Sequence, residues 1–493
     1  MTAPHVIVVG AGMGGLAAAL DLLSAGARVT VLERQPAPGG KMREVMVAGQ
    51  AIDSGPTVMT MRWIFDDLFS RAGLQFSEQL KLHSSDLLAR HSWLDGSRLD
   101  LFADMSRSRE AIADFAGATE ARAYEKFVAK AAKTFDTLDH TFMRATRPNA
   151  LQLGGRVGLR RLPGLMAANP FVSLWDELSK IFSDPRLIQL FGRYSTYCGS
   201  SPFLAPSTLM LIAEAERRGV WLVEGGMQRL AETLAKAIIA AGGEIRYQST
   251  ETELRTGSGR VNGVLLKDGE IVDADAVIFN GDSQALVEGL LGQQAVRASK
   301  ARPESGFTLS AITLSAVGQA TGFPLGYHTV FFGDDYKEEF AAVFQRGEIC
   351  ARPTVYVCAQ DRSRHESNIP GAERLFCLIN APPKVLSEAT IEDSVASLRA
   401  HLAEHGLQLA IADGDEVVTT PARFAERFPG SRGALYGQAI HGPWGSFTRA
   451  GSCSRLAGLF LAGGSVHPGA GIPMAAQSGC LAASAAADHL GLN

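Results

Sequence analysis

Short apolar runs alternate along this chain with longer segments in which apolar and polar residues recur at helical spacing. The first apolar run, from His5 to Val9, predicts a buried strand, and the run from Leu16 to Ala25 predicts a helix after it. A second strand is predicted from Arg28 to Leu32. A strand, a helix and a strand in this order are typical of the first unit of a dinucleotide-binding α/β domain.

A Gly-rich turn, Gly10-Ala-Gly12-Met-Gly-Gly15, joins the first strand to the helix. Its glycines permit the tight turn, let backbone approach a pyrophosphate and let the helix pack on the strand, while the helix N–H groups face the phosphates. Glu33 follows the second strand, where ribose hydroxyls lie in such a unit. The predicted dinucleotide contacts are Gly10, Gly12, Met13, Gly14, Gly15, Glu33 and Arg34.

The chain repeats this kind of turn near its C-terminus. The apolar run from Gly458 to Ala462 predicts a strand, and a helix is predicted from Ile472 with Pro473 in its first turn, where the missing N–H costs nothing. The positive end of that helix suits an anionic reduced flavin ring. We expect both ends of the chain to hold one ligand; the alternative is an ordinary Gly-rich αβ turn. The C-terminal contacts are Gly463, Gly464, Gly471, Ile472, Pro473 and Met474.

Two further segments favour FAD over NAD. The stretches 39–41 and 53–57 carry small residues that let a second loop lie against the cofactor, and Lys41 is placed to reach a phosphate. The stretch 257–263 is typical of a hairpin turn and opens no helix, so no second dinucleotide fingerprint is visible. FAD is therefore the one cofactor predicted. Its further contacts are Gly39, Gly40, Lys41, Gly55, Pro56 and Thr57.

The middle of the chain divides into helices and a second sheet. Residues 66–219 are expected to be mostly helical, whereas later apolar runs are expected to be strands, first of the cofactor domain and then of the second sheet. The predicted strands are 220–223, 244–247, 260–266, 276–280, 309–317, 330–332, 355–359 and 375–380, with a helix over 228–241.

The expected fold class is α/β, with three interleaved parts. They are a Rossmann-like FAD-binding domain (1–75, 220–285 and 445–493), a mixed-sheet substrate domain (286–444) and a helical subdomain (76–219) that faces substrate and membrane.

Length, net charge and cysteine content limit the kinds of protein and partner that this sequence predicts. A length of 493 residues suits two or three domains, and a net charge of −4 argues against a nucleic-acid partner. The six cysteines form no C-x-x-C pair or metal-ligand cluster, so no redox disulfide or metal site is predicted. No signal peptide and no run of 18 apolar residues is visible. We expect a cytoplasmic protein associated peripherally with a membrane.

Several motifs together resemble those of the bacterial phytoene-desaturase-type carotenoid desaturases. They are the N-terminal fingerprint, Gly39-Gly40-Lys41, Gly55-Pro56-Thr57, Gly225-Gly226-Met227 and the run from His467 to Pro473. The resemblance covers nearly the whole chain and is weakest over 85–185. Within the family, the runs 353–362, 428–437 and 441–444 look most like those of the hydroxyneurosporene, or 1-hydroxycarotenoid 3,4-, desaturases. Glu251 departs from the family, which usually has an apolar residue there whose backbone meets the adenine.

The resemblance implies an FAD-dependent oxidoreductase that removes a hydride from carbon 4 and a proton from carbon 3 of a 1-hydroxylated acyclic carotenoid. Alternatives are a general phytoene desaturase or a carotenoid isomerase. Two hypotheses from other classes are an amine or porphyrinogen oxidase and a non-enzymatic lipid-binding protein on the same fold. The electron acceptor, oxygen or quinone, stays open.

The sequence identifies no general base. His467, inside the C-terminal turn, is a weak candidate for proton transfer, and bracing of the loop is the alternative. A buried substrate hydroxyl needs a polar partner, because leaving it unpaired costs about 1 to 3 kcal/mol. Weak candidates for substrate contact, each with a structural role as the alternative, are Arg193, Tyr194, Tyr197, His328 and His441.

Residues 156–175 combine basic and apolar side chains in a pattern suited to a lipid surface. We expect this segment to contact membrane lipid; the alternative is a core helix with solvated arginines. The side chains concerned are Arg156, Arg160, Arg161, Leu162, Leu165, Met166, Phe171, Leu174 and Trp175.

Overall fold

The computed structural model describes residues 3–149, 151–158, 169–362 and 371–492. A five-stranded parallel sheet forms its centre, in the order β19-β13-β1-β2-β9. Its strands are β1 (His5–Val9), β2 (Arg28–Leu32), β9 (Glu244–Arg246), β13 (Ala276–Phe279) and β19 (Leu459–Leu461). Because both faces of β1 are covered, the strand is fully buried and is apolar from Val6 to Val9. The predictions of β1, β2, β9, β13 and β19 are confirmed to within two residues.

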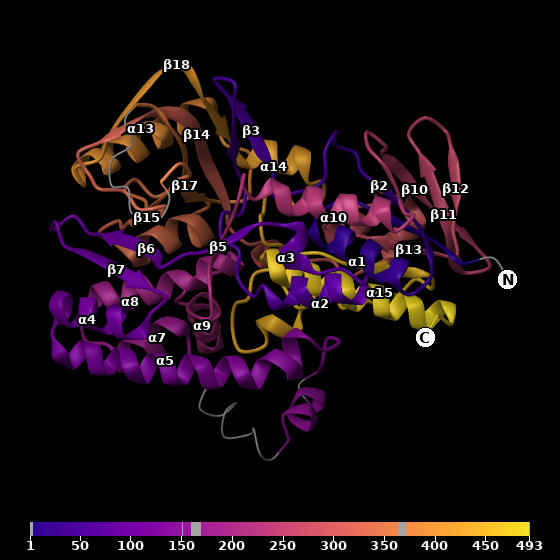
Figure 1. The fold of residues 1–493 in the computed structure, drawn as a ribbon, viewed down its shortest axis with the longest axis horizontal. Helices are drawn as coiled ribbons and strands as arrows, with labels where there is room; N and C mark the ends of the chain where they lie inside the picture. Colours follow the sequence, from indigo (N-terminus) through magenta and orange to yellow (C-terminus); the bar gives the residue numbers. More distant parts are fainter. Residues whose placement is uncertain (1–2, 150, 159–168, 363–370, 493) are drawn as a thin grey trace.

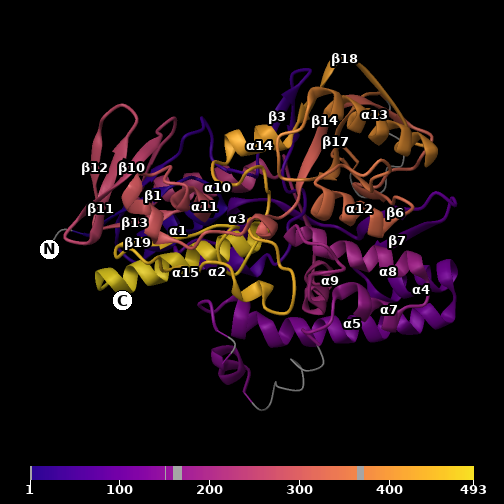
Figure 2. The same ribbon diagram turned by 180° about the vertical axis from the view of Figure 1, so that it is seen from behind.

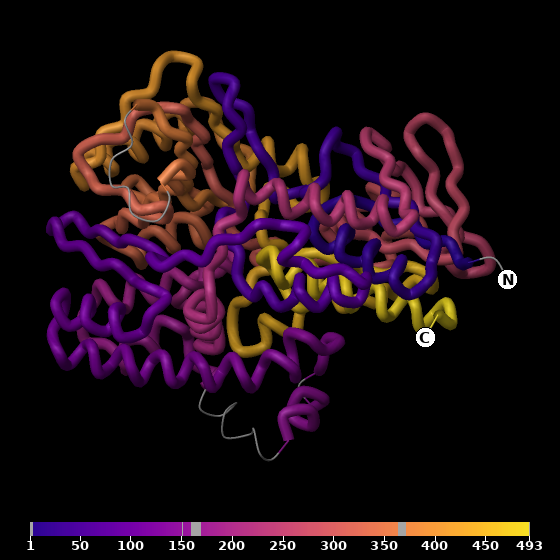
Figure 3. Tube along the Cα trace, in the orientation of Figure 1, coloured from indigo at the N-terminus to yellow at the C-terminus, as the bar shows by residue number. Residues whose placement is uncertain are grey.

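Three helices pack one on another beside this sheet, as Figure 1 and the view from behind in Figure 2 both show. They are α10 (Gln228–Ala240), α1 (Met13–Ser24) and α15 (Ile472–Leu490). The N- and C-termini lie at the same end of the molecule (Figure 3).

Helices α1 and α15 approach each other as closely as backbone allows. A Cβ atom added to Gly479 would lie 2.1 Å from the carbonyl oxygen of Gly14, and one added to Gly14 would lie 2.7 Å from the amide of Gly463. The amide of Gly463 in turn donates to the hydroxyl of Ser478 on α15 (3.2 Å). These contacts hold the two helix N-termini side by side.

A seven-stranded mixed sheet forms the second layer, in the order β18-β14-β17-β16-β15-β6-β7 (Figure 1). Its strands are β6 (Leu87–Ser92), β7 (Arg98–Phe102), β14 (Ser310–Thr321), β15 (His328–Phe331), β16 (Val355–Ala359), β17 (Glu373–Ala381) and β18 (Gln408–Thr419). Side chains alternate between its faces. Leu375 and Cys377 pack toward α13 (Glu388–Glu404), whereas Phe376 and Leu378 on the opposite face line a cavity.

The helical part lies against this sheet and is held together by stacked aromatic rings. Phe182 and Phe191 stack at 5.1 Å between ring centroids, and Phe127 packs on both. The helices of this part are α4 (Met105–Ala116), α5 (Ala118–Leu138), α7 (Leu174–Ile181), α8 (Pro185–Gly192) and α9 (Leu211–Arg217). Helix α2 (Trp63–Arg71) instead packs on α1 and α15, and α3 (Phe76–Gln79) packs on α2. The later helices are α11 (Ser283–Val287), α12 (Tyr336–Ala341) and α14 (Pro421–Arg427). In the described part of the chain, none of these helices combines the length and apolarity needed to cross a bilayer.

The structure corrects the expectation for residues 66–219, which are helical only in part. Strands β5 (Leu82–Ser84), β6 and β7 lie in this segment, and β6 pairs in parallel with β15 of the mixed sheet. Strand β18 and the hairpin of β3 (Glu44–Val47) and β4 (Gln50–Asp53) were also not predicted, because most of their residues are exposed or only half-buried. The hairpin expected over 257–263 is confirmed, since β10 (Glu251–Gly257) pairs antiparallel with β11 (Arg260–Leu266), next to β12 (Ile271–Asp273). The remaining strand, β8 (Trp221–Val223), pairs with β5. The domain boundaries stay a prediction.

The contact between α1 and α15 predicts a large effect of a single methyl group. We expect Gly479→Ala to lower the free energy of unfolding by about 1 to 3 kcal/mol, because the added Cβ overlaps a backbone oxygen that cannot move away. Thermal unfolding of the purified protein measures this. Gly155→Ala is the matched control, because it also lies in a helical stretch but its added Cβ meets no atom within 4 Å. Equal melting temperatures for the two variants would contradict the proposed contact.

Candidate functional site

A cavity of about 750 Å³ lies where the parallel sheet, the mixed sheet and the helices meet. One arm of it runs along the Gly-rich turns at the carboxyl ends of β1, β13 and β19. The other arm is walled by the mixed sheet and by helices of the helical part. Ligands of open parallel sheets bind where the strand order reverses, and here that point is β1, which has β2 on one side and β13 on the other.

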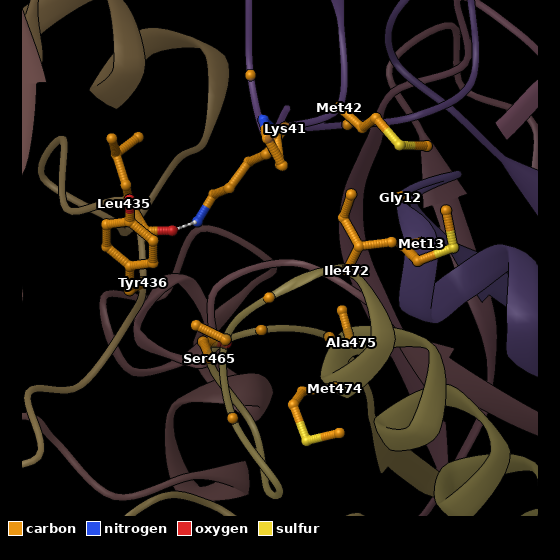
Figure 4. Close-up of a pocket in the computed structure, with 18 of the residues that line it drawn as sticks. Gly12, Met13, Lys41, Met42, Leu435, Tyr436, Ser465, Ile472, Met474 and Ala475 are labelled. Carbon is orange, nitrogen blue, oxygen red and sulfur yellow. Dashed lines mark hydrogen bonds between the residues drawn. The ribbon is translucent and has the colours of Figure 1, made fainter. Parts of the chain in front are cut away.

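Both α1 and α15 point their N-termini into the first arm (Figure 4). Each helix begins after a glycine, Gly12 or Gly471, and no side chain caps either helix. Their first N–H groups are therefore free to bind an anion. A Cβ added to Gly471 would meet no atom within 4 Å, so the wall there leaves room for a ligand. These features fit the pyrophosphate and ring system of a flavin dinucleotide.

Glu33 fixes the first Gly-rich turn to the end of β2. One oxygen of its carboxylate accepts from the amide of Ala11 (2.7 Å) and the other from the amide of Gln35 (2.8 Å). Burial raises the pKa of this carboxyl, although the two hydrogen bonds oppose the shift. Each oxygen keeps a further lone pair, which is available to a ribose hydroxyl.

The predicted cofactor residues come together on one wall of the cavity. Gly15 alone lies behind it, where an added Cβ would be 2.0 Å from the carbonyl oxygen of Gly10, in keeping with a role in helix packing. The residues on the wall are Gly10, Gly12, Met13, Gly14, Glu33, Arg34, Gly39, Gly40, Lys41, Gly55, Pro56, Thr57, Glu251, Gly463, Gly464, Gly471, Ile472, Pro473 and Met474.

Lys41 lies on this wall and contacts protein rather than open space. Its ammonium donates to the carbonyl of Leu435 (2.5 Å), as Figure 4 shows, and lies over the ring of Phe428. Burial lowers the pKa of Lys41 to about 8. The phosphate contact predicted for this residue stays a prediction.

Two residues that the sequence reasoning missed support the Gly-rich turns. The side-chain amide of Asn280 donates to the carbonyl of Gly10 (3.2 Å) and lies against Gly12 and Gly14. Its position just after a parallel strand was the available signal. The guanidinium of Arg449 is 1% exposed and donates to the carbonyls of Gly464 and Gln438, both at 2.7 Å, so it anchors the C-terminal turn; no pattern in the sequence marks it.

The second arm is mostly apolar but carries one group of polar side chains. Tyr194 and Tyr197 both donate to the carboxylate of Glu216, at 2.7 and 2.6 Å. The guanidinium carbon of Arg193 lies 5.7 Å from the ring centroid of Tyr197 and 5.6 Å from that of Tyr356. Arg193, Tyr197, Glu216 and Tyr356 line the cavity, whereas Tyr194 lies behind them. Glu216 was not predicted, because nothing in the sequence of α9 distinguishes it from its neighbour Glu214.

The two histidines that were weak candidates for substrate contact lie behind the cavity wall instead of on it. His328 lies 2.7 Å from the hydroxyl of Tyr356, which is itself 2.6 Å from the hydroxyl of Thr57. His441 accepts a hydrogen bond from the amide of Ser201 (3.1 Å). Both histidines therefore support neighbouring residues in this structure.

His467 also lies off the cavity wall and braces its loop. Its Nε2 lies 3.0 and 2.9 Å from the carbonyl oxygens of Phe142 and Ala145, which makes it a hydrogen-bond donor to both. Burial lowers the pKa of His467 to about 4. This geometry fits the structural alternative and gives the ring no contact with the cavity.

Comparison with known proteins gives a consistent result. The family model described as "Flavin containing amine oxidoreductase" matches residues 13–487. The chain is 46% identical to a hydroxyneurosporene desaturase of Rubrivivax gelatinosus, over 99% of this chain and 94% of that protein. It is 44% identical to a hydroxyneurosporene desaturase of Cereibacter sphaeroides, over 98% and 97%. A solved structure of a putrescine oxidase variant shares the fold, with a TM-score of 0.60 and 14% identity over 99% of both chains.

We expect Glu251 to make FAD binding dependent on pH. Its carboxyl faces the arm that holds Glu33 and Arg34, and burial raises its pKa to about 7. Occupation of the arm excludes water and disfavours the charged form, so the affinity for FAD should fall as the pH rises through 7. We expect roughly tenfold weaker binding at pH 8.5 than at pH 6, measured by titration of the apoprotein with FAD.

Glu251→Gln should flatten this dependence, because the amide keeps the shape without the charge. Glu253→Gln, on the same strand but outside the cavity, is the matched control and should keep the wild-type dependence. If FAD binding to Glu251→Gln keeps the wild-type pH dependence, another titratable group causes that dependence.

Proposed function

This chain belongs to the flavin-containing amine oxidoreductase family, and from that premise we propose that it is an FAD-dependent desaturase that forms the 3,4 double bond of a 1-hydroxylated acyclic carotenoid. Two relatives at 46% and 44% identity over nearly the full chain are hydroxyneurosporene desaturases. The observation that carries the proposal is a mostly apolar cavity arm, open to the cofactor arm, in which Arg193 and Glu216 are the charged side chains.

The chemistry of the substrate explains why the polar group lies near the cofactor. The hydroxyl sits on carbon 1, only two bonds from carbon 3 and three from carbon 4. A residue that binds the hydroxyl must therefore lie beside the reacting carbons. Arg193 meets this condition, because it lies over the ring of Tyr356, whose hydroxyl is 2.6 Å from that of Thr57 on the cofactor wall.

Arg193 and Tyr197 together match the hydrogen-bonding capacity of an alcohol. A guanidinium can only donate, whereas the phenol oxygen of Tyr197 is left to accept because its proton is donated to Glu216. An alcohol offers one donor and two acceptor lone pairs, so it is satisfied between them. A chain end without the hydroxyl would leave further donors of the buried guanidinium unsatisfied, at a cost of about 1 to 3 kcal/mol.

Bound FAD supplies the acceptor for the hydride that leaves carbon 4. The chain orients the substrate for this transfer and excludes water from it. Leu209 and Ile212 on one side, and Phe376 and Leu378 on the other, line the arm with apolar surface that holds a polyene by shape. Productive transfer needs reacting atoms about 3 to 3.5 Å apart, so this shape controls the rate.

Substrate preference tests the proposed function. The FAD-loaded protein should turn over 1-hydroxyneurosporene in liposomes much faster than neurosporene. Arg193→Met should lower turnover of the hydroxylated substrate by roughly ten- to hundredfold, because it removes the donor but keeps the length of the side chain. Turnover of neurosporene by the same variant serves as the control and should change little. Equal wild-type rates on both carotenoids, measured by chromatography of the products, would contradict the proposal.

We also propose that the protein takes its substrate from a membrane through an exposed apolar patch, defined as Phe171, Leu204 and Trp444. These side chains are 65%, 49% and 54% exposed. Ring contacts of 5.8 to 6.0 Å run from Phe171 through Trp444 and Phe447 to Phe142, which lines the cavity.

Charge supports a lipid partner for this patch. Residues 140–175 contain five arginines and no Asp or Glu, so the segment is attracted to anionic lipid. Arg160, Arg161, Leu162, Leu165 and Met166 lie outside the described residues. The expectation was wrong for Leu174, which is fully buried. It stays a prediction for Trp175, which is half-buried and packs on Phe203 and Tyr336.

The double variant Phe171→Ser with Trp444→Ser should bind vesicles of phosphatidylcholine and phosphatidylglycerol roughly tenfold more weakly or worse, because each ring loses its apolar area in the lipid. Vesicle co-sedimentation measures this. Val385→Ser is the control, since Val385 is 76% exposed and lies between β17 and α13, and Figure 1 shows α13 on the side of the molecule opposite α5 and α7. If the double variant sediments like the control, the patch does not dock on lipid.

A further inference from the structure

We propose that Glu216 is the catalytic residue that accepts the proton released from carbon 3. This inference rests on the function proposed above and assigns the proton step, for which the sequence identified no residue.

The cavity wall offers few alternatives. Four carboxylates line it among the described residues, namely Glu33, Glu216, Glu251 and Asp282. Glu33 and Glu251 lie on the dinucleotide arm, and Asp282 forms an ion pair with Arg302 (2.8 Å). No histidine of the described part of the chain lies on the wall. Glu216 is therefore the carboxylate that the second arm provides.

The surroundings of Glu216 suit a base. The residue is 6% exposed, and burial raises the pKa of its carboxyl, while the hydrogen bonds from the two tyrosines and the charge of Arg193 oppose the shift. A buried negative charge also stabilises the positive charge that develops on the polyene when hydride leaves.

Charged and titratable groups face Glu216 from several elements. Arg193, Tyr194 and Tyr197 approach it from the turn 193–198. On its own helix, Glu214 and Arg217 pair with each other (2.7 Å). On α5, Tyr124 lies beyond Tyr194, on the far side of the ring of Phe191.

The proton transfer balances without a further reactant. The C–H bond at carbon 4 breaks with its electron pair, and FAD accepts this hydride. The C–H bond at carbon 3 then releases a proton, and its electron pair becomes the second bond between carbons 3 and 4. The proton goes to Oε1 of Glu216, the oxygen bonded to the cavity-lining Tyr197, which keeps a free lone pair. The two tyrosines hold the carboxylate in place throughout.

The pH dependence of turnover distinguishes a base from a structural residue. A carboxylate base is active only when ionised, so the wild-type rate should fall on the acidic side of a single ionisation. Glu216→Gln should remove this acidic limb of the pH–rate profile and lower the rate at which the desaturated product forms from 1-hydroxyneurosporene by about a hundredfold or more. Deuterium at carbon 3 should slow the variant more than the wild type, because proton loss becomes limiting.

The tyrosines give the sharper test. Each donates to Glu216, so removing either hydroxyl raises the pKa of the carboxyl and should move the acidic limb to higher pH. Tyr194→Phe is decisive, because Tyr194 lies behind the wall and reaches the substrate only through Glu216. Tyr124→Phe is the matched control and should leave the limb in place.

The outcomes separate this inference from the proposed function. If the wild type fails to convert 1-hydroxyneurosporene, the proposed function is wrong. If the wild type converts it while Glu216→Gln keeps both rate and acidic limb, or Tyr194→Phe leaves the limb unmoved, then Glu216 is not the base. The FAD content of each variant shows that its fold is intact, and Tyr194→Phe still decides the question if Glu216→Gln does not fold.

Discussion

The whole arrangement depends on the approach of α1 to α15 at Gly14 and Gly479. A side chain on Gly479 would meet the carbonyl oxygen of Gly14 at 2.1 Å, and one on Gly14 would meet the amide of Gly463 in the C-terminal turn at 2.7 Å, so only glycine permits this packing. The consequence is that two helix N-termini, about 460 residues apart in the chain, point into one arm of one cavity. Arg449 then holds the C-terminal turn from the other side through two backbone carbonyls. Binding of a dinucleotide thereby joins both ends of the chain.

Elements that are identified by their own residues, without their pairing partners, could be predicted from the sequence. The strands beside β1 are buried on both faces, so a short apolar run identified each of them, and the Gly-rich turns identified the helices that come after β1 and β19. Strands β6 and β18 could not be identified in this way. Strand β6 pairs with β15, more than 200 residues later, and β18 is an edge strand with many exposed polar residues. Pairing partners that lie far along the chain, rather than composition, make these segments strands.

The two arms of the candidate site differ in the same way in how well the sequence predicts them. The wall of its cofactor arm is largely main chain, and glycines mark the places where the main chain must turn or approach a ligand closely. Nearly all of the predicted contacts therefore lie on this wall. The second arm is built from side chains brought together by tertiary packing. Glu216 on α9 meets two tyrosines of a neighbouring turn, whereas His328 and His441 are held behind the wall by Tyr356 and Ser201. No spacing in the sequence distinguishes a histidine on the wall from one behind it.

An apolar arm with one polar group has a further consequence for specificity. A polyene gains little free energy on leaving lipid for an apolar cavity, because both surroundings are apolar, so contact area discriminates poorly among carotenoids. Discrimination therefore falls to the hydroxyl, and the polar side chains that can satisfy it adjoin the cofactor wall through Tyr356 and Thr57. The hydrogen bonds that recognise the substrate thus also set the position of carbons 3 and 4. The residues that recognise the substrate and those that align it for reaction therefore lie on one wall of the cavity. A carotenoid without the hydroxyl loses alignment with the cofactor as well as affinity.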